Sequence, residues 1–135
     1  MTWSAPIANG SPITAYAIYI KTAAGALVQD LTNCDGSQAV IYNNRICTIP
    51  LSDLYASPYN LAQGASIEAT VLAINFYGSS LSSPVGSGGI IVVVPFAPTG
   101  LVNNSTATTD TIVGITWTAS VTGGSAVLHY SVYYD

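Results

Sequence analysis

Apolar residues recur at every second position over much of the chain. In residues 15–20 the larger apolar side chains Tyr16, Ile18 and Ile20 alternate with the positions between them, and residues 67–74 alternate in the same way. Both segments are rich in residues that favour β-structure, and Gly, Pro, Asn or Ser flank them. A period of two is typical of a strand with one face toward a core. These segments are therefore predicted to be strands.

Turn-forming residues separate these segments at short intervals. Examples are Asn9–Pro12, Cys34–Gly36 and Gly86–Gly89. No segment has the pattern of a capped amphipathic helix, and the nearest approach, Leu51–Tyr55, is short and soon followed by Pro58. Many short strands at this spacing indicate an all-β fold, either a sandwich or a barrel.

The two ends of the chain repeat one another at an offset of 114 residues. Residues 1–21 read MTWSAPIANGSPITAYAIYIK, and residues 115–135 read ITWTASVTGGSAVLHYSVYYD. The matched residues of the first copy are Thr2, Trp3, Ala5, Gly10, Ser11, Tyr16 and Tyr19, and their counterparts are Thr116, Trp117, Ala119, Gly124, Ser125, Tyr130 and Tyr133. The repeat unit is thus close to the size of an immunoglobulin-like domain.

A strand ending in Trp, a loop of small residues and then Tyr-x-Ile/Val-x-Tyr together resemble the fibronectin type III family. The resemblance implies an immunoglobulin-like antiparallel β-sandwich, with Trp3 and Trp117 on strand B and Tyr16 and Tyr130 opening strand C. Residues 69–78 resemble strand F, and Pro95–Leu101 resembles the junction that enters a new strand A. The family's Tyr at the start of strand F is replaced here by Ile67.

This alignment divides the chain into one nearly complete domain and the start of a second. Residues 1–95 cover strands B to G without strand A, and residues 96–135 cover strands A to C of the next repeat. Ile90–Val94 is predicted to be strand G, paired with strand F. We expect the chain to be a window onto a tandem array, in preference to a subunit whose open end docks on a neighbour.

The repeated aromatic residues Trp3, Tyr16, Trp117 and Tyr130 are predicted to pack between the sheets, in preference to serving as stacking platforms for a sugar or peptide. A second set faces the opposite side of strands C and F. If those strands are neighbours, an uncharged apolar stripe results, with these members: Tyr19, Leu72, Ile74 and Tyr133. The stripe is either a lateral contact or is covered by the long excursion between Gly25 and Ile46.

Formally charged side chains make up only 6% of the chain, two basic and six acidic, and the net charge is −4. Two cations cannot form a nucleic-acid footprint or a polybasic membrane anchor. The longest apolar run, Ile90–Val94, is too short to cross a bilayer. We therefore expect no nucleic-acid partner and no membrane insertion.

Few residues suit catalysis, so no catalytic, cofactor-binding or metal site is predicted. Glu68 has no second acid nearby in sequence, which removes the basis for paired-carboxylate chemistry. His129 is predicted to be a solvated strand residue. A calcium site at Asp30, Asp35 and Asp53 lacks the spacing that would support it.

Cys34 and Cys47 are either reduced and buried or joined in one disulfide, and we favour the disulfide, which would imply an oxidising compartment. Three triplets match the N-x-[ST] acceptor pattern for glycosylation, at Asn9, Asn103 and Asn104, with Asn104 first.

These observations predict a non-enzymatic extracellular or cell-surface module, the repeat unit of a filament, stalk or surface protein. Its expected partners are neighbouring copies of itself or adjacent repeats of the same chain, and glycans as a further possibility. The alternative is a spacer or a ligand- or glycan-binding module of a secreted adhesin or carbohydrate-active enzyme.

Overall fold

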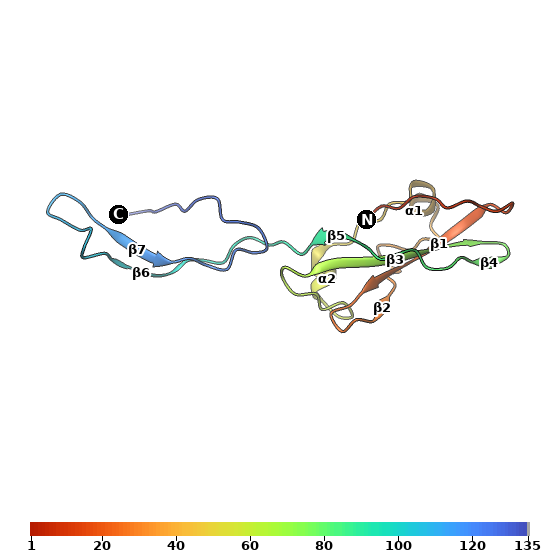
Figure 1. The fold of residues 1–135 in the computed structure, drawn as a ribbon, viewed down its shortest axis with the longest axis horizontal. Coiled ribbons are helices and arrows are strands. Elements are labelled where there is room, and N and C mark those ends of the chain that lie inside the picture. Colours follow the sequence, from red (N-terminus) through yellow and green to blue (C-terminus); the bar gives the residue numbers. More distant parts are fainter. Residues whose placement is uncertain (135) are drawn as a thin grey trace. The chain divides into compact units, whose positions relative to one another are not determined.

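The computed structural model describes residues 1–134 and divides the chain into two compact units, Met1–Ile91 (unit 1) and Val92–Asp135 (unit 2) (Figure 1). The division falls a few residues before the junction at Pro95 that the sequence alignment suggests. The described residues are mostly strands and connections, with two short helices. The predicted all-β class is confirmed.

Unit 1 is built on one antiparallel sheet of five strands in the order β2-β1-β3-β4, with β5 also paired to β3. The strands are β1 (Ile13–Lys21), β2 (Leu27–Val28), β3 (Ser66–Asn75), β4 (Gly78–Ser79) and β5 (Gly86–Ile90). β1 and β3 are direct neighbours, from Ile13 opposite Asn75 to Ile20 opposite Ala69. The two segments predicted as strands from their alternation therefore form the centre of the sheet.

The alternation of β1 separates its two faces as the pattern predicts. Tyr16, Ile18 and Ile20 are 5%, 2% and 0% exposed, whereas the positions between them are only half-buried. Val71 and Ala73 of β3 pack on the same side as Tyr16 and Ile18, which defines the inner face of the sheet. Burying one face of two adjacent strands is the main source of stability for such a sheet.

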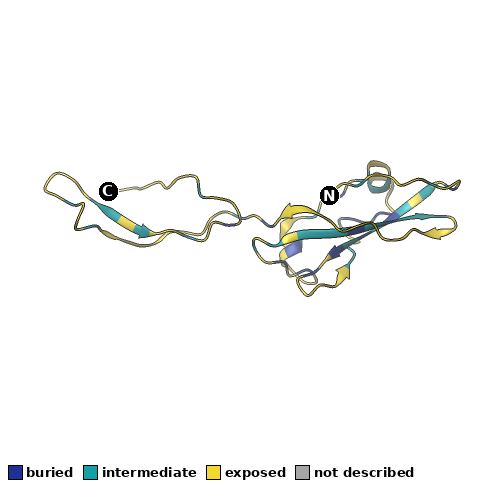
Figure 2. Cartoon of the chain, viewed as in Figure 1, coloured by how far each residue is buried: buried dark blue, intermediate teal, exposed yellow. Residues whose placement is uncertain are grey.

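Two apolar clusters cover parts of this inner face. One cluster joins Ile20 and Ile91 to helix α2 (Leu51–Tyr55) and to Tyr59 and Leu61. The other joins Tyr16 and Ile18 to Cys34 and Cys47, and residues of helix α1 (Ala39–Asn44) pack against it. In Figure 2 the buried segments gather in unit 1, along β1 and the connections that face it.

The excursion from Gly25 to Ile46 lies against the inner face through Ile41 and Tyr42. The hypothesis that it covers the outer stripe of the sheet is therefore wrong. The excursion also forms α1, which the sequence analysis missed, and the Leu51–Tyr55 segment that it judged too weak is α2. Both helices are short, so most of their stability comes from packing rather than from helix propensity.

A short second layer faces the sheet. The N-terminal segment pairs antiparallel with the end of the excursion through the bridge between Thr2 and Ile46. The backbone N–H of Trp3 donates to the carbonyl of Arg45 at 3.2 Å, and that of Cys47 donates to the carbonyl of Met1 at 3.0 Å. These bonds hold the indole of Trp3 over the inner face.

The predicted strand G is shifted along the chain. We expected Ile90–Val94 to pair with β3, but the paired strand is β5, formed by the glycine-rich segment and ending at Ile90. Ile91 then turns its side chain into the core, where it is 0% exposed, and Val92 begins unit 2. Gly89 fits here because its position leaves little space beside Ile67.

Unit 2 contains one antiparallel pair, β6 (Thr99–Asn103) with β7 (Ile115–Thr118). The sequence alignment predicts strands in these two segments. The expected strand C is wrong for the described residues, because residues 125–134 form no strand and His129 is in irregular chain.

We predict that Gly36→Ala destabilises unit 1 by about 2–3 kcal/mol. The new Cβ would overlap the carbonyl oxygen of Tyr16 and lie 2.7 Å from Cδ1 of Ile18, at a point where the N–H of Tyr16 donates to Gly36 at 3.0 Å. Gly86→Ala is the control, since its nearest neighbour is the carbonyl oxygen of Ala69 at 3.7 Å. Urea unfolding of both variants measures the difference, and equal stabilities would contradict the close approach at Gly36.

Candidate functional site

The repeated Trp and Tyr residues form the same aromatic contact in both units. The rings of Trp3 and Tyr16 lie 5.3 Å apart at an interplanar angle of 71°. Those of Trp117 and Tyr130 also lie 5.3 Å apart, at 63°. Edge-to-face packing at this distance is a favourable aromatic geometry. In unit 1 the Tyr is buried, whereas Tyr130 is 39% exposed.

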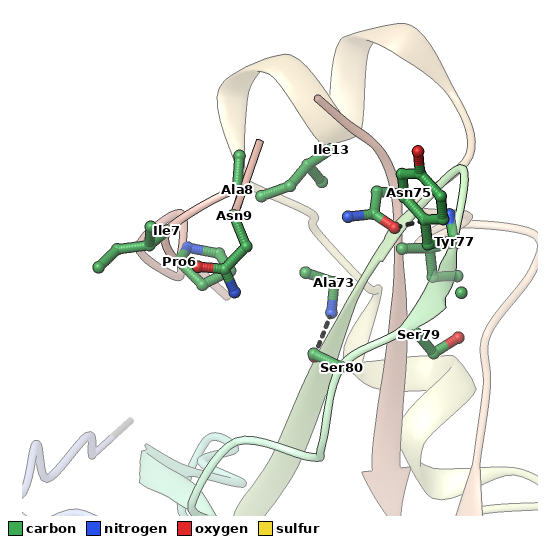
Figure 3. Close-up of a pocket in the computed structure, with 12 residues that line it drawn as sticks. Pro6, Ile7, Ala8, Asn9, Ile13, Ala73, Asn75, Tyr77, Ser79 and Ser80 are labelled. Atoms are coloured by element: carbon green, nitrogen blue, oxygen red, sulfur yellow. Dashed lines mark hydrogen bonds between the residues drawn. The ribbon is translucent and has the colours of Figure 1, made fainter. Parts of the chain in front are cut away.

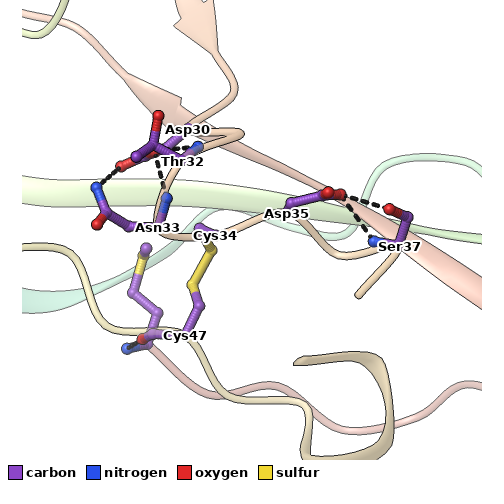
Figure 4. Close-up of a disulfide and its surroundings, with 8 residues drawn as sticks. Asp30, Thr32, Asn33, Cys34, Asp35, Ser37 and Cys47 are labelled. Carbon is purple, nitrogen blue, oxygen red and sulfur yellow. Dashed lines mark hydrogen bonds between the residues drawn. A yellow bond between two sulfur atoms is a disulfide. The ribbon is translucent and has the colours of Figure 1, made fainter. Parts of the chain in front are cut away.

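Cys34 and Cys47 form a disulfide, as predicted, and Figure 4 shows it beside the turns of the excursion. Their Cα atoms lie 5.2 Å apart, and both side chains are buried among Tyr16 and Ile18. The bond links the turn after Asp30 to the segment that pairs with the N-terminus. It therefore fastens the second layer of unit 1 to the excursion.

Asp30 organises the turn that precedes Cys34. One carboxylate oxygen accepts the backbone N–H groups of Thr32 and Asn33, each at 2.9 Å, and the other accepts the side-chain amide of Asn33 at 2.9 Å. Partial burial raises the pKa of Asp30, but the hydrogen bonds from Asn33 and Thr32 outweigh it, so the pKa lies below its usual value. The same amide of Asn33 also donates to Asp53 at 2.8 Å.

The pKa of the neighbouring Tyr59 hydroxyl is raised. Burial is the largest cause, and the negative charges of Asp30 and Asp53 add to it. These three residues line an open polar hollow of about 290 Å³ at this end of unit 1. The acids face a neutral amide rather than a cation.

Asp35, the third residue of the calcium hypothesis, lies apart from Asp30 and faces Ser37 in Figure 4. Its carboxylate accepts hydrogen bonds from the hydroxyl of Ser37 at 2.7 Å and the side-chain amide of Gln38 at 2.9 Å. Those bonds lower the pKa of Asp35, and the bond from Gln38 has the largest effect. Residues 1–134 bring no three His, Cys, Asp or Glu side chains together as metal ligands.

The outer face of the sheet carries the apolar stripe that the sequence analysis describes. Cross-strand partners on this face are Ala17 with Leu72, Ala15 with Ile74 and Tyr19 with Thr70. All are half-buried except the buried Thr70.

At one end of the stripe, Lys21 and Glu68 form an ion pair of 2.7 Å. The stripe is therefore apolar along its length and charged at one end. Tyr133 belongs to unit 2, where it is 90% exposed and in no strand.

A shallow hollow of about 340 Å³ lies at the loop end of unit 1 (Figure 3). Pro6, Asn9, Asn75 and Tyr77 are among the residues that line it. Phe76, next in sequence to Tyr77, is 87% exposed, and Tyr77 is 85% exposed. Their rings lie 5.4 Å apart at 88°. The sequence analysis assigned this pair only to a strand end and missed its exposure, since alternation does not report the shape of a turn.

The three Asn residues of the glycosylation motifs lie in turns or at strand ends. Asn9 is exposed at a positive φ of 51° and borders the hollow of Figure 3. Asn103 is the exposed last residue of β6. Asn104 is half-buried, and its side-chain oxygen accepts the hydroxyl of Thr106 at 2.7 Å.

Comparisons with models of known protein families, with curated proteins and with solved structures found no match. No helix within residues 1–134 is long and apolar enough to span a membrane.

The Asp30 turn predicts acid sensitivity. Because the folded pKa of Asp30 is lowered, its contribution to stability is complete above the unfolded pKa of about 3.9 and is lost as the pH falls through the folded pKa. Asp30→Asn should lower the free energy of unfolding by about 1 kcal/mol at pH 7 and flatten its decline below pH 4. Urea unfolding between pH 7 and pH 2 measures both effects. An unchanged slope in the variant would refute the role given to Asp30.

Proposed function

We propose that this chain is a non-enzymatic, extracellular structural module that assembles with copies of itself or with adjacent repeats. We further propose that its units are immunoglobulin-like sandwiches of the fibronectin type III kind, repeated in tandem. A filament, stalk or surface layer is the assembly that such repeats build.

The observation that carries the proposal is the recurrence of one aromatic pair in both units. Trp3 with Tyr16 and Trp117 with Tyr130 have the same centroid separation, 114 residues apart in the chain. In unit 1 the pair sits between the sheet and the short second layer. In a sandwich of the resembled family, strands B and C would place these residues between the two sheets, so the contact supports the proposal. Tandem arrays are built from repeated units that share the same internal contacts.

The surface chemistry supports an architectural role. With so few charged side chains, the chain has little electrostatic repulsion to keep copies apart. The acids that unit 1 does carry are engaged by neutral donors or by Lys21. The Cys34–Cys47 disulfide supports an oxidising, extracellular setting.

We propose the outer stripe of β1 and β3 as the lateral contact of this assembly. Leu72 and Ile74 stand opposite Ala17 and Ala15, so larger side chains on one strand face small ones on the other. This arrangement of large and small side chains allows two such faces to interdigitate. The ion pair of Lys21 and Glu68 limits the contact at one end.

We predict that Leu72→Lys abolishes concentration-dependent association of the chain. A charge in the stripe would have to be desolvated in the contact, which costs at least several kcal/mol. The matched control is Val40→Lys on α1, where the side chain is already 68% exposed and the net charge changes equally. Sedimentation velocity and negative-stain electron microscopy measure the association. A wild-type chain that stays monomeric at every concentration would refute the proposed function.

A second candidate function rests on the exposed Phe76–Tyr77 pair beside the hollow of Figure 3. Aromatic faces next to the amides of Asn9 and Asn75 suit a sugar or a short peptide. For this function we predict saturable glycan-array binding that Tyr77→Ala removes. Tyr134→Ala, at a residue that is 94% exposed in unit 2, should leave that binding intact. Absence of binding by the wild-type chain favours assembly alone.

A further inference from the structure

The turn that leads into β1 places an asparagine directly before a glycine. Asn9 and Gly10 are its central residues, and the backbone N–H of Ser11 donates to the carbonyl of Ala8 at 3.2 Å across it. Asn9 has a φ of 51° and Gly10 a φ of 86°. Two successive positive φ values are typical of a type I′ turn, for which Asn-Gly is a preferred pair. No other asparagine of the chain precedes a glycine.

An Asn-Gly pair places a nucleophile next to an amide. Attack by the backbone nitrogen of Gly10 on the side-chain carbon Cγ of Asn9 closes a five-membered ring. Glycine has no side chain to obstruct the approach of this nitrogen, and a Cβ added at Gly10 would have no atom within 4 Å. Both residues are exposed, so water reaches the ring that forms.

Neither reacting group is held by a hydrogen bond within the part of the chain that the structure describes. No carbonyl accepts the backbone N–H of Gly10 there. In Figure 3 the side chain of Asn9 lies at the border of the hollow, without a hydrogen bond to the other residues drawn. The nitrogen and the amide can therefore approach one another without breaking a contact with the rest of the protein.

Asn60 provides a comparison within the same unit. It is exposed and has a similar positive φ of 50°. Its amide donates to the carbonyl of Pro58 at 3.4 Å. The nitrogen that would attack it belongs to Leu61, which is buried and donates its N–H to the carbonyl of Leu54 at 2.9 Å. The two asparagines thus share a backbone conformation and differ in the freedom of the attacking nitrogen.

The internal repeat shows that the turn does not need the amide. The counterparts of Asn9 and Gly10, 114 residues later, are Gly123 and Gly124. Their φ values are 79° and 91°, so both are positive, as in the first copy. Two glycines therefore support this kind of turn without a side chain. The amide of Asn9 is an addition to the turn and not a requirement for it.

We propose that Asn9 is a site of spontaneous deamidation through a cyclic imide. The nitrogen of Gly10 loses its proton and bonds to Cγ of Asn9, the bond from Cγ to the side-chain nitrogen breaks, and ammonia leaves with that proton. Water then opens the ring at one of its two carbonyls. Opening at Cγ gives aspartate. Opening at the backbone carbonyl gives isoaspartate, in which the backbone runs through Cβ and Cγ.

The modification changes the charge and the shape of this end of unit 1. Asn9 borders the hollow of about 340 Å³ together with Asn75 and Tyr77. Either product carries a carboxylate that is ionised at pH 7, so a chain with a net charge of −4 gains one negative charge. Aspartate keeps the turn, since Asp-Gly also suits type I′, whereas isoaspartate lengthens the backbone. This inference is independent of the proposed function and holds equally for a monomer.

Incubation of the full chain at pH 7, produced without a glycan at Asn9, tests the site. Peptide mapping by mass spectrometry should find aspartate and isoaspartate at position 9 and an intact amide at Asn60. A peptide of residues 5–14 gives the rate of the unfolded segment. The folded chain should react less than about tenfold more slowly, a difference of about 1.4 kcal/mol in activation free energy. A larger delay, or equal conversion at Asn60, overturns the proposal.

Substitution assigns the new charge to Asn9. The wild-type chain should accumulate an acidic species in ion-exchange chromatography, and Asn9→Gly, which copies the turn of unit 2, should lose it. Asn60→Gly is the matched control, because it removes an exposed amide at a similar φ and should leave the acidic species unchanged. Loss of the species in both variants, or in neither, contradicts the assignment. The mapping experiment needs no variant, so it decides the site even where Asn9→Gly fails to fold.

Discussion

The antiparallel register between β1 and β3 determines where every other part of unit 1 can pack. Tyr16 opposite Ala73 and Ile18 opposite Val71 place the larger side chains of one strand beside smaller ones of the next on the inner face. A shift of one residue would turn the apolar set outward. The excursion, the disulfide and both helices all lie against this face. Their packing therefore depends on the register between β1 and β3.

The same register produces the outer stripe, because a strand with apolar residues on both faces cannot hide them all in a single core. Small side chains at Ala15 and Ala17 reduce the exposed apolar area, and the ion pair of Lys21 and Glu68 marks its end. We propose that contact with another protein surface covers this face, in a chain that has only eight charged side chains. The low charge of the chain and the apolar side chains on both faces of β1 and β3 are thus the two features on which the proposed lateral contact rests.

Features that depend on strict alternation or on covalent chemistry were accessible from sequence. Alternation predicted the strands β1 and β3 and the common face of Tyr16, Ile18 and Ile20, and the disulfide was the favoured state of the two cysteines. Features set by tertiary packing were not accessible. α1 forms where the excursion meets the core, without a side-chain cap at Gln38.

The position of strand G and the surface sites also depend on tertiary packing and could not be predicted from sequence. β5 occupies a glycine-rich segment that has low strand propensity because the edge of β3 accepts it. The pattern also could not reveal the exposed Phe76–Tyr77 pair, which depends on the shape of the turn after β3.

The disulfide gives unit 1 a mechanical property. Cys34 and Cys47 are 13 residues apart, and the bond holds their Cα atoms at 5.2 Å. When tension extends an unfolding unit at about 3.4 Å per residue, the residues between the cysteines stay outside the loaded path. The oxidised unit therefore releases about 40 Å less contour length than the reduced one. A fibre made of such units would therefore lengthen less for each unit that unfolds under tension.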